Sequence, residues 1–331
     1  MHGLLCPKCR ERIFFEQCLC FNCDQPVLFD PAALSVRGLN EGTACANREF
    51  IGCNWSTDDG NKYCRSCSLT RIIPNLSTYK NRLLWNRVEQ AKRRLVYDLS
   101  RLKLPLASRT GTEIAFDILA DDVAGSPVMT GHLAGLITLN LAEADDIERE
   151  TRRVAFRETY RTLLGHFRHE VGHFYWELLV AHTTLEGPFR IIFGDESRDY
   201  QAALTEYHGR PDRSYDQTGY ITEYATSHPW EDWAETFAHF LHIVSVLDTV
   251  AALPLSLDQR TLQTLEDPYL ESDFEALLSS WTPLAYSINE LNRSLGLRDA
   301  YPFRVSRAVT GKLHFVHMAI QKFRDEATRQ A

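Results

Sequence analysis

The 331-residue sequence lacks the features that mark membrane-spanning and exported proteins. No stretch of it approaches the roughly 18 consecutive apolar residues that a transmembrane helix needs. The N-terminus, Met1-His2-Gly3-Leu4-Leu5-Cys6, has neither the charged region nor the long apolar stretch of a signal peptide. We therefore expect a cytoplasmic protein that makes no contact with a membrane.

Cysteine is absent after position 67, although the sequence holds 9 cysteines in all. In the reducing environment of the cytoplasm, such clustered thiols indicate bound metal rather than disulfides. The remaining composition, with 44% hydrophobic and 24% charged residues, is ordinary for a soluble globular protein. The cysteines therefore form a distinct N-terminal feature of an otherwise average chain.

Positive charge is scarce in the larger, C-terminal part of the chain. Residues 111–331 carry 34 acidic and 19 basic side chains, whereas residues 81–110 carry 2 acidic and 8 basic ones. An acidic domain repels the phosphate backbone, so nonspecific nucleic-acid binding is not expected of it. The basic segment, over Tyr79 to Lys103, has leucines at helical spacing and predicts a linking helix whose basic side faces solvent or the acidic domain.

The spacing of the cysteines predicts zinc sites. Two C-x₂-C knuckles, separated by ten residues, each present two thiolates and together complete one tetrahedral site. A second set of four has one clean knuckle and two more widely spaced members. The predicted ligands are Cys6, Cys9, Cys20 and Cys23 in the first set, and Cys45, Cys53, Cys64 and Cys67 in the second. This module is expected to bind one or two zinc ions and to need them for folding, with Cys18 left as a free thiol.

The sequence His169-Glu170-x-x-His173 is the motif around which the rest of the chain is organised. Histidines four residues apart lie on one face of a helix, so both imidazoles can reach one zinc ion. Glu170 lies beside them, where it can act on the attacking water. The apolar residues that follow indicate that this helix is buried.

A second segment offers the third ligand that a catalytic zinc ion requires. Pro229 suits the first turn of a helix, so Glu231 lies at the start of that helix and Glu235 one turn later on the same face. One of these carboxylates can bind the metal while the other orients a ligating imidazole. Tyr224 and His228 immediately precede the segment and are candidate donors to an oxyanion.

These motifs together resemble the gluzincin pattern, and more specifically a bacterial family of zinc-binding metallopeptidases with an N-terminal zinc ribbon. The resemblance covers nearly the whole chain. It implies that Glu231 binds zinc together with His169 and His173, and that Glu235 orients an imidazole. It also implies a protein or peptide substrate and hydrolysis by a metal-activated water, with Glu170 as the general base.

The expected fold is α+β, with a mostly helical, zincin-like domain that contains a small antiparallel sheet. The expected division is a rubredoxin-like zinc ribbon over residues 1–74, a basic linking helix over 75–110 and a metallopeptidase domain over 111–331. Residues 111–119 and 135–143 are predicted as strands. The resemblance implies that an antiparallel edge strand beside the zinc helix holds extended substrate, and an ordinary strand of the sheet is the alternative for each of them.

Two other functions are compatible with the same sequence. The peptidase-like domain could be catalytically inactive and serve as an adaptor that binds partner proteins through the zinc ribbon. Alternatively, the ribbon and the basic helix could bind DNA or RNA, which salt-dependent binding would reveal. The presence of Glu170, which an inactive descendant would most simply lose, favours the enzyme.

Overall fold

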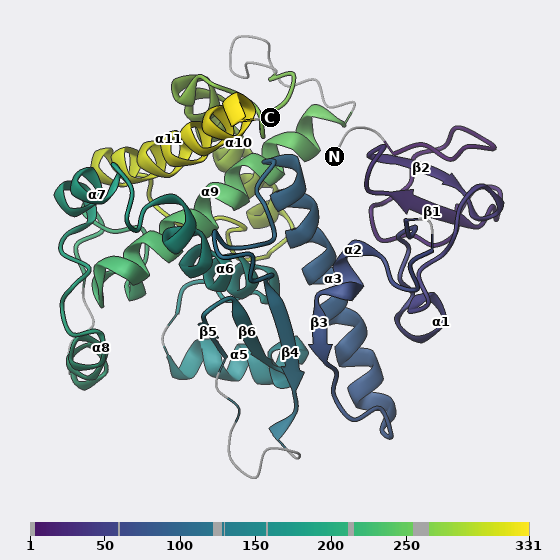
Figure 1. Ribbon diagram of the computed structural model, residues 1–331, viewed down its shortest axis with the longest axis horizontal. Helices are drawn as coiled ribbons and strands as arrows, with labels where there is room; N and C mark the ends of the chain where they lie inside the picture. The colour runs from purple at the N-terminus through teal and green to yellow at the C-terminus, as the bar shows by residue number, and fades with distance from the viewer. Residues whose placement is uncertain are drawn as a thin grey trace.

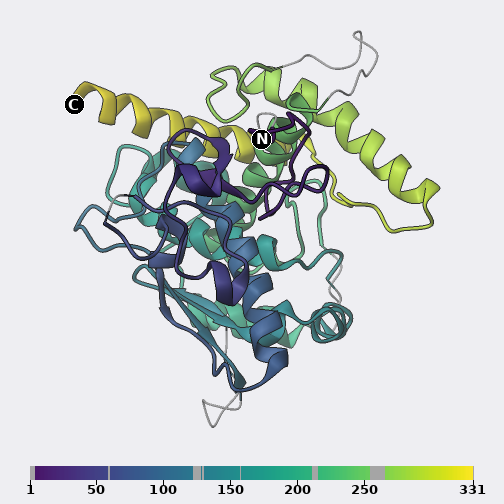
Figure 2. The same ribbon diagram turned by 90° about the vertical axis from the view of Figure 1, so that its right-hand side faces the viewer.

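In the computed structural model of this chain, a small cysteine-rich module lies against a larger, mostly helical domain. Helix α3, Tyr79–Arg101, lies between the two parts (Figures 1 and 2). The structure describes residues 4–58, 60–121, 128, 130–156, 158–210, 215–253 and 265–330. Among these residues no helix combines the length and apolar character needed to cross a membrane.

The N-terminal module contains little regular secondary structure. Strands β1, Val27–Asp30, and β2, Ser35–Gly38, form an antiparallel hairpin in which Val27 is opposite Gly38. The other elements are a 3₁₀ turn, η1, over Leu39–Glu41 and two single-turn helices, α1 over Arg48–Ile51 and α2 over Arg65–Ser68. Metal ligation would therefore have to supply much of the folding energy of this module.

The predicted linking helix is present as α3, and its leucine face is buried. The expectation for its basic side was wrong in part, because Lys92 and Arg93 are themselves buried rather than exposed. Arg101, near the end of α3, pairs with Asp248 and Asp267 of the acidic domain, as predicted.

The predicted α+β class is confirmed, but the sheet is mixed rather than antiparallel. Its four strands lie in the order β3-β4-β6-β5, and only the β5–β6 pair is antiparallel. The strands are β3 over Thr70–Ile72, β4 over Ala115–Leu119, β5 over Gly131–Leu133 and β6 over Leu136–Asn140. Parallel pairing requires a crossover connection. Here α3 connects β3 to β4, and the segment containing β5 connects β4 to β6.

The remaining elements are helical. They are η2, Leu141–Ala144; α5, Asp146–Ala155; α6, Leu163–Leu179; α7, Glu186–Phe193; α8, Tyr200–Gly209; η3, Tyr224–Thr226; α9, Pro229–Ala251; α10, Phe274–Ser294; and α11, Arg307–Gln330. The composition of residues 182–227 predicts loop with short helices, and α7 and α8 lie there. The final 75 residues are predicted as mostly helical, and α10 and α11 confirm this.

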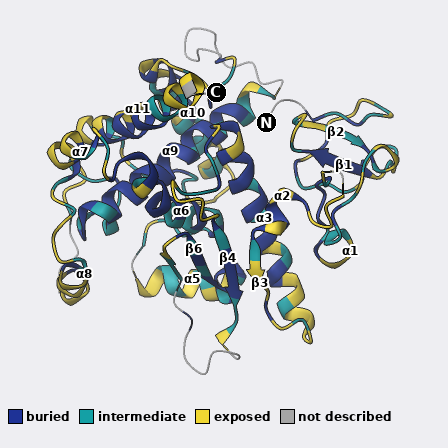
Figure 3. Cartoon of the chain, viewed as in Figure 1, coloured by how far each residue is buried: buried dark blue, intermediate teal, exposed yellow. Residues whose placement is uncertain are grey.

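Helices α6 and α9 pack directly against each other in the core of the large domain, where buried residues are concentrated (Figure 3). Gly172 of α6 faces Ala234 of α9 so closely that an added Cβ would lie 2.9 Å from the Ala234 Cα. The indole of Trp233 donates a hydrogen bond of 2.8 Å to the carbonyl of Gly172. This close crossing brings the two predicted metal-binding segments together.

The cysteine-rich module is attached to the large domain by an aromatic cluster. The ring of Phe15 lies 5.2 Å from that of Tyr97 on α3, and Tyr97 in turn contacts Tyr269. Strand β3, which falls inside the predicted module, pairs with β4 of the large domain. The predicted boundary at residue 74 therefore follows a strand that belongs to the sheet of the large domain.

Candidate metal centres

Helix α6 brings the side chains of His169 and His173 close together. The Nε2 atoms of His169 and His173 lie 3.2 Å apart. The helix begins where the Thr162 hydroxyl accepts a hydrogen bond from the backbone N–H of Gly165, which caps the first turn. Both imidazoles therefore have the positions that the i, i+4 spacing predicts.

Glu231, in the first turn of α9, completes the group. Its Oε2 atom lies 3.0 Å from Nε2 of His169 and 3.4 Å from Nε2 of His173. The three candidate ligand atoms all lie within 4.8 Å of one another. Glu231 Oε2 is buried and has no satisfactory hydrogen bond among the described residues. A buried carboxylate oxygen without a hydrogen bond, next to two imidazole nitrogens, fits a divalent cation such as zinc.

The second carboxylate of α9 contacts one of these imidazoles from the far side. Glu235 Oε1 lies 2.6 Å from Nδ1 of His169. A proton on Nδ1 leaves the lone pair of Nε2 free to bind metal, which is the arrangement expected of an orienting carboxylate. The structure thus places Glu231 beside the Nε2 atoms of both histidines and Glu235 beside Nδ1 of His169.

The electrostatics of this cluster favour a cation. Burial by itself disfavours the charged forms of both Glu231 and His169. The attraction between the Glu231 carboxylate and the His169 imidazolium outweighs the effect of burial. His173 adds to the attraction that acts on Glu231, and Glu235 adds to the attraction that acts on His169. The pKa of Glu231 is therefore held well below its ordinary value and the pKa of His169 well above it.

Tyr200, at the start of α8, is a partner of the site that the sequence analysis missed. Its hydroxyl donates a hydrogen bond of 2.5 Å to Oε1 of Glu231, whereas the histidines lie near the other carboxylate oxygen, Oε2. No spacing in the sequence connects residue 200 to residue 231, so only the folded structure reveals this contact.

Glu170 is half-buried beside the three candidate ligands. Burial raises its pKa, and the neighbouring His169 and His173 only partly oppose that effect. A carboxylate with a raised pKa is a stronger proton acceptor, which suits the predicted general base.

The two predicted oxyanion donors differ in their surroundings. Tyr224 lies in η3, with its ring 5.8 Å from that of His169, and burial raises its pKa well above the ordinary value. His228, by contrast, caps α9: its Nδ1 accepts a hydrogen bond from the N–H of Trp230, and its Nε2 contacts the carbonyl of Arg198. Both of its ring nitrogens are engaged away from the ligand cluster, so the prediction for His228 is not supported.

His173 is held by ring contacts rather than by a carboxylate. The Trp230 ring lies 4.0 Å from its imidazole, and His132 of β5 stacks with it at 6.3 Å. Its Nδ1 has no hydrogen-bond partner among the described residues. Strand β5 is the edge of the sheet, so an edge strand does lie beside the zinc helix, although it falls outside the two predicted strands.

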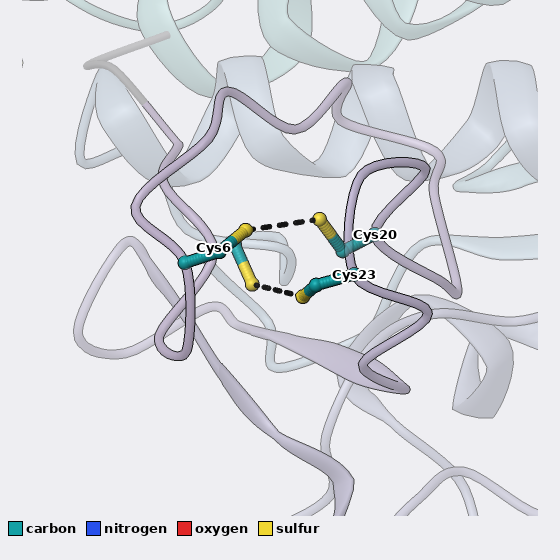
Figure 4. Close-up of side chains that lie close together, drawn as sticks. Cys6, Cys20 and Cys23 are labelled. Atoms are coloured by element: carbon teal, nitrogen blue, oxygen red, sulfur yellow. Dashed lines mark hydrogen bonds between the residues drawn. The ribbon is translucent and has the colours of Figure 1, made fainter.

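The first cysteine set comes together as predicted. Figure 4 shows three of its members, Cys6, Cys20 and Cys23, close together. The Sγ atoms of Cys6 and Cys23 are 3.7 Å apart, and those of Cys9 and Cys20 are 3.6 Å apart. These distances suit four thiolates around one zinc ion.

The second cysteine set forms a separate group. Cys45, Cys53, Cys64 and Cys67 are all buried, and their sulfur atoms are mutually within 4.8 Å. Cys18 belongs to neither group and donates a hydrogen bond to the carbonyl of Gly52, as expected of a free thiol. The two groups offer two separate Cys₄ sites.

A mostly helical domain with a His-Glu-x-x-His helix, crossed by a helix that carries a carboxylate, is typical of zinc-binding metallopeptidases. The chain belongs to the family described as "Putative zinc-binding metallo-peptidase", whose model matches residues 81–319. A zinc-ribbon domain model matches residues 4–78. The first match supports zinc binding by the large domain, and the second identifies the N-terminal module as a zinc ribbon.

The relatives found extend over almost the whole chain. Uncharacterized proteins of Mycobacterium tuberculosis and Mycobacterium bovis are each 39% identical to it over 333 residues, covering 97% of this chain and 96% of the relative. No solved structure matches the chain significantly.

Proposed function

We propose that this protein is a zinc-dependent peptidase of the gluzincin type, with His169, His173 and Glu231 as the metal ligands. The observation that carries the proposal is the convergence of two imidazole nitrogens and one buried carboxylate oxygen. A His₂Glu set leaves one coordination position open, as a catalytic zinc ion requires. When bound, zinc would supply Lewis acidity toward a peptide carbonyl and toward water.

Glu170 is the general base in this proposal. It follows a ligand directly on α6 but is not itself a member of the ligand group. Its carboxylate accepts a proton from the water that attacks the scissile carbonyl carbon, and it then delivers that proton to the amine nitrogen as the C–N bond breaks.

Tyr224 is the candidate donor to the oxyanion that forms during attack. A tyrosine phenol is protonated at neutral pH and the pKa of Tyr224 is raised further by burial, so the hydroxyl can donate a hydrogen bond. Tyr200 has a different task, because its hydroxyl binds the carboxylate of Glu231 and fixes its orientation.

The substrate in this proposal is a protein or peptide, and the zinc ribbon is a candidate surface for a partner protein. Comparing newly formed peptide N-termini in a cytosolic extract tests the activity without assuming a substrate. Wild-type protein should generate new termini that are absent with Glu170→Gln and absent when a chelator is added. If both proteins give the same profile while capturing the same partner, the chain is an adaptor and not an enzyme.

A further inference from the structure

The helix between the two parts of the molecule carries a buried cation without a hydrogen-bond partner in the part of the chain that the structure describes. Arg93 of α3 is 1% exposed, and its Nε, Nη1 and Nη2 atoms make no hydrogen bond with any described residue. Burying an unpaired charge is energetically costly, so such a guanidinium indicates a negative group that the protein atoms alone do not provide.

The second cysteine set lies against the same part of α3. Helix α2, which contains Cys67, packs on α3. The Cys67 Sγ atom lies 4.0 Å from Oε2 of Glu89, which is one helical turn before Arg93 on the same face. Lys92 is also fully buried, and its ammonium lies 2.9 Å from Glu89 Oε1.

We propose that Arg93 is the counter-charge of a zinc ion bound by Cys45, Cys53, Cys64 and Cys67. Four thiolates around Zn²⁺ carry a net charge of −2, which a buried guanidinium from another element can offset. The Lys92 ammonium pairs with the Glu89 carboxylate, so the negative charge of Glu89 is balanced and does not repel the nearby thiolates. The second zinc ion thus joins the ribbon to the large domain, whereas the first lies within the ribbon.

The contacts around α3 connect this junction to the catalytic helix. Strand β3 follows α2 and begins at Thr70. The hydroxyl of Thr70 donates a hydrogen bond of 2.7 Å to Glu89 of α3. Further along α3, Asp98 accepts a hydrogen bond of 2.7 Å from Arg168 of α6, next to the ligand His169. Loss of the second zinc ion would therefore loosen β3 and α3, and through α3 the position of α6.

The first cysteine set has a different environment. Cys9 and Cys23 are only half-buried, whereas all four members of the second set are buried. The proposal thus predicts that the two structural zinc ions are released at different rates. Opening of the ribbon alone releases the zinc ion of the first set, whereas release from the second set requires the ribbon and the large domain to separate.

Timed chelation of the full-length, zinc-loaded protein tests this proposal. Free thiols are alkylated during exposure to a chelator, and mass spectrometry identifies which cysteines have been released at each time. Arg93→Met is compared with Arg87→Met, which removes an exposed arginine from the same helix. We expect Arg93→Met to speed release of Cys45, Cys53, Cys64 and Cys67 at least tenfold while release of the first set stays unchanged. Arg87→Met should match wild type for both sets.

Equal release of the second set in wild type and Arg93→Met would overturn the proposal. So would equal acceleration of both sets, because that would indicate general destabilisation. Arg93→Lys keeps the charge and should restore much of the slow release. Hydrogen exchange on the wild-type protein needs no variant: β3 and α3 should lose protection together with alkylation of the second set. Protection that persists after that alkylation would also contradict the proposal.

Discussion

The crossing of α6 and α9 at Gly172 offers the sharpest test of how packing positions the metal ligands. In Gly172→Ala, the added Cβ would lie 2.9 Å from the Ala234 Cα and 3.1 Å from its carbonyl oxygen. Both contacts are with backbone, so no side-chain rotation can relieve them and the helices must separate. Overpacking of this kind typically costs about 1–3 kcal/mol, against a gain of up to about 1 kcal/mol from replacing glycine by alanine in a helix.

The same displacement should weaken zinc binding. His173 follows Gly172 directly, and Glu231 lies just under one turn before Ala234, so separation at the crossing moves ligands on both helices. Zinc sites accept ligand distances only within roughly 0.2 Å of ideal values. If the whole packing penalty of about 1–3 kcal/mol is subtracted from the free energy of zinc binding, zinc affinity drops by about 5- to 150-fold, since 1.4 kcal/mol corresponds to a factor of ten.

Chemical denaturation followed by tryptophan fluorescence and zinc competition with a chromogenic chelator measure the two effects. Gly187→Ala is the matched control, because that glycine is also helical but an added Cβ meets nothing within 4 Å. It should be neutral or slightly stabilising. Adding Ala234→Gly to Gly172→Ala should not restore the site, since the closest contact is with Cα. Wild-type stability and zinc affinity in Gly172→Ala would refute the reasoning.

Other substitutions test individual contacts. Glu235→Gln should leave zinc bound but cost about 10- to 100-fold in affinity or activity, the usual effect of losing an orienting carboxylate, as equilibrium zinc titration would reveal. Tyr200→Phe removes a hydrogen bond to a charged group and should weaken zinc binding by about 1.5–3 kcal/mol in the same titration; an unchanged affinity would argue against its role. Lys312→Met strips Asp232 of its buried partner, and thermal unfolding should show a loss of about 3–5 kcal/mol that Asp232→Asn largely recovers. A fragment of residues 75–331 lacks β3 and exposes the aromatic cluster on α3, so it should aggregate or bind hydrophobic dyes; a stable fragment with native circular dichroism would contradict this.

The candidate ligands that the sequence grouped correctly in space lie close together along the chain. The pair His169 and His173, like each C-x₂-C knuckle, needs only one helical turn or one tight loop to bring its members together. The start of α9 at Pro229 was also a local signal. Such features are visible in sequence because the physics that positions them acts over a few residues.

The features that were missed depend on tertiary packing. Tyr200 reaches Glu231 only because α8 lies near the start of α9. Arg93 has a place in sequence typical of a solvent-exposed basic face, yet its side chain is buried. His228 precedes a helix, where the sequence predicts a donor to an oxyanion, whereas its side chain caps that helix. In each case the polar group's partner is distant in sequence or is the backbone itself.

The parallel strand pairs have the same explanation. Strand β3 is three residues long and follows a cysteine knuckle, so nothing in its local pattern assigns it to the sheet of the large domain. Its pairing with β4 depends on α3 folding back across the sheet. The register of such a short strand is a property of the assembled fold.

Zinc content, measured by elemental analysis of the full-length protein, tests the central claim most directly. The account predicts about three zinc ions per chain in the wild type, one for each Cys₄ set and one between α6 and α9. Glu231→Gln should retain about two, while Glu235→Gln at saturating zinc should retain about three. A wild-type protein with two zinc ions, and a Glu231→Gln variant with the same two, would contradict the account.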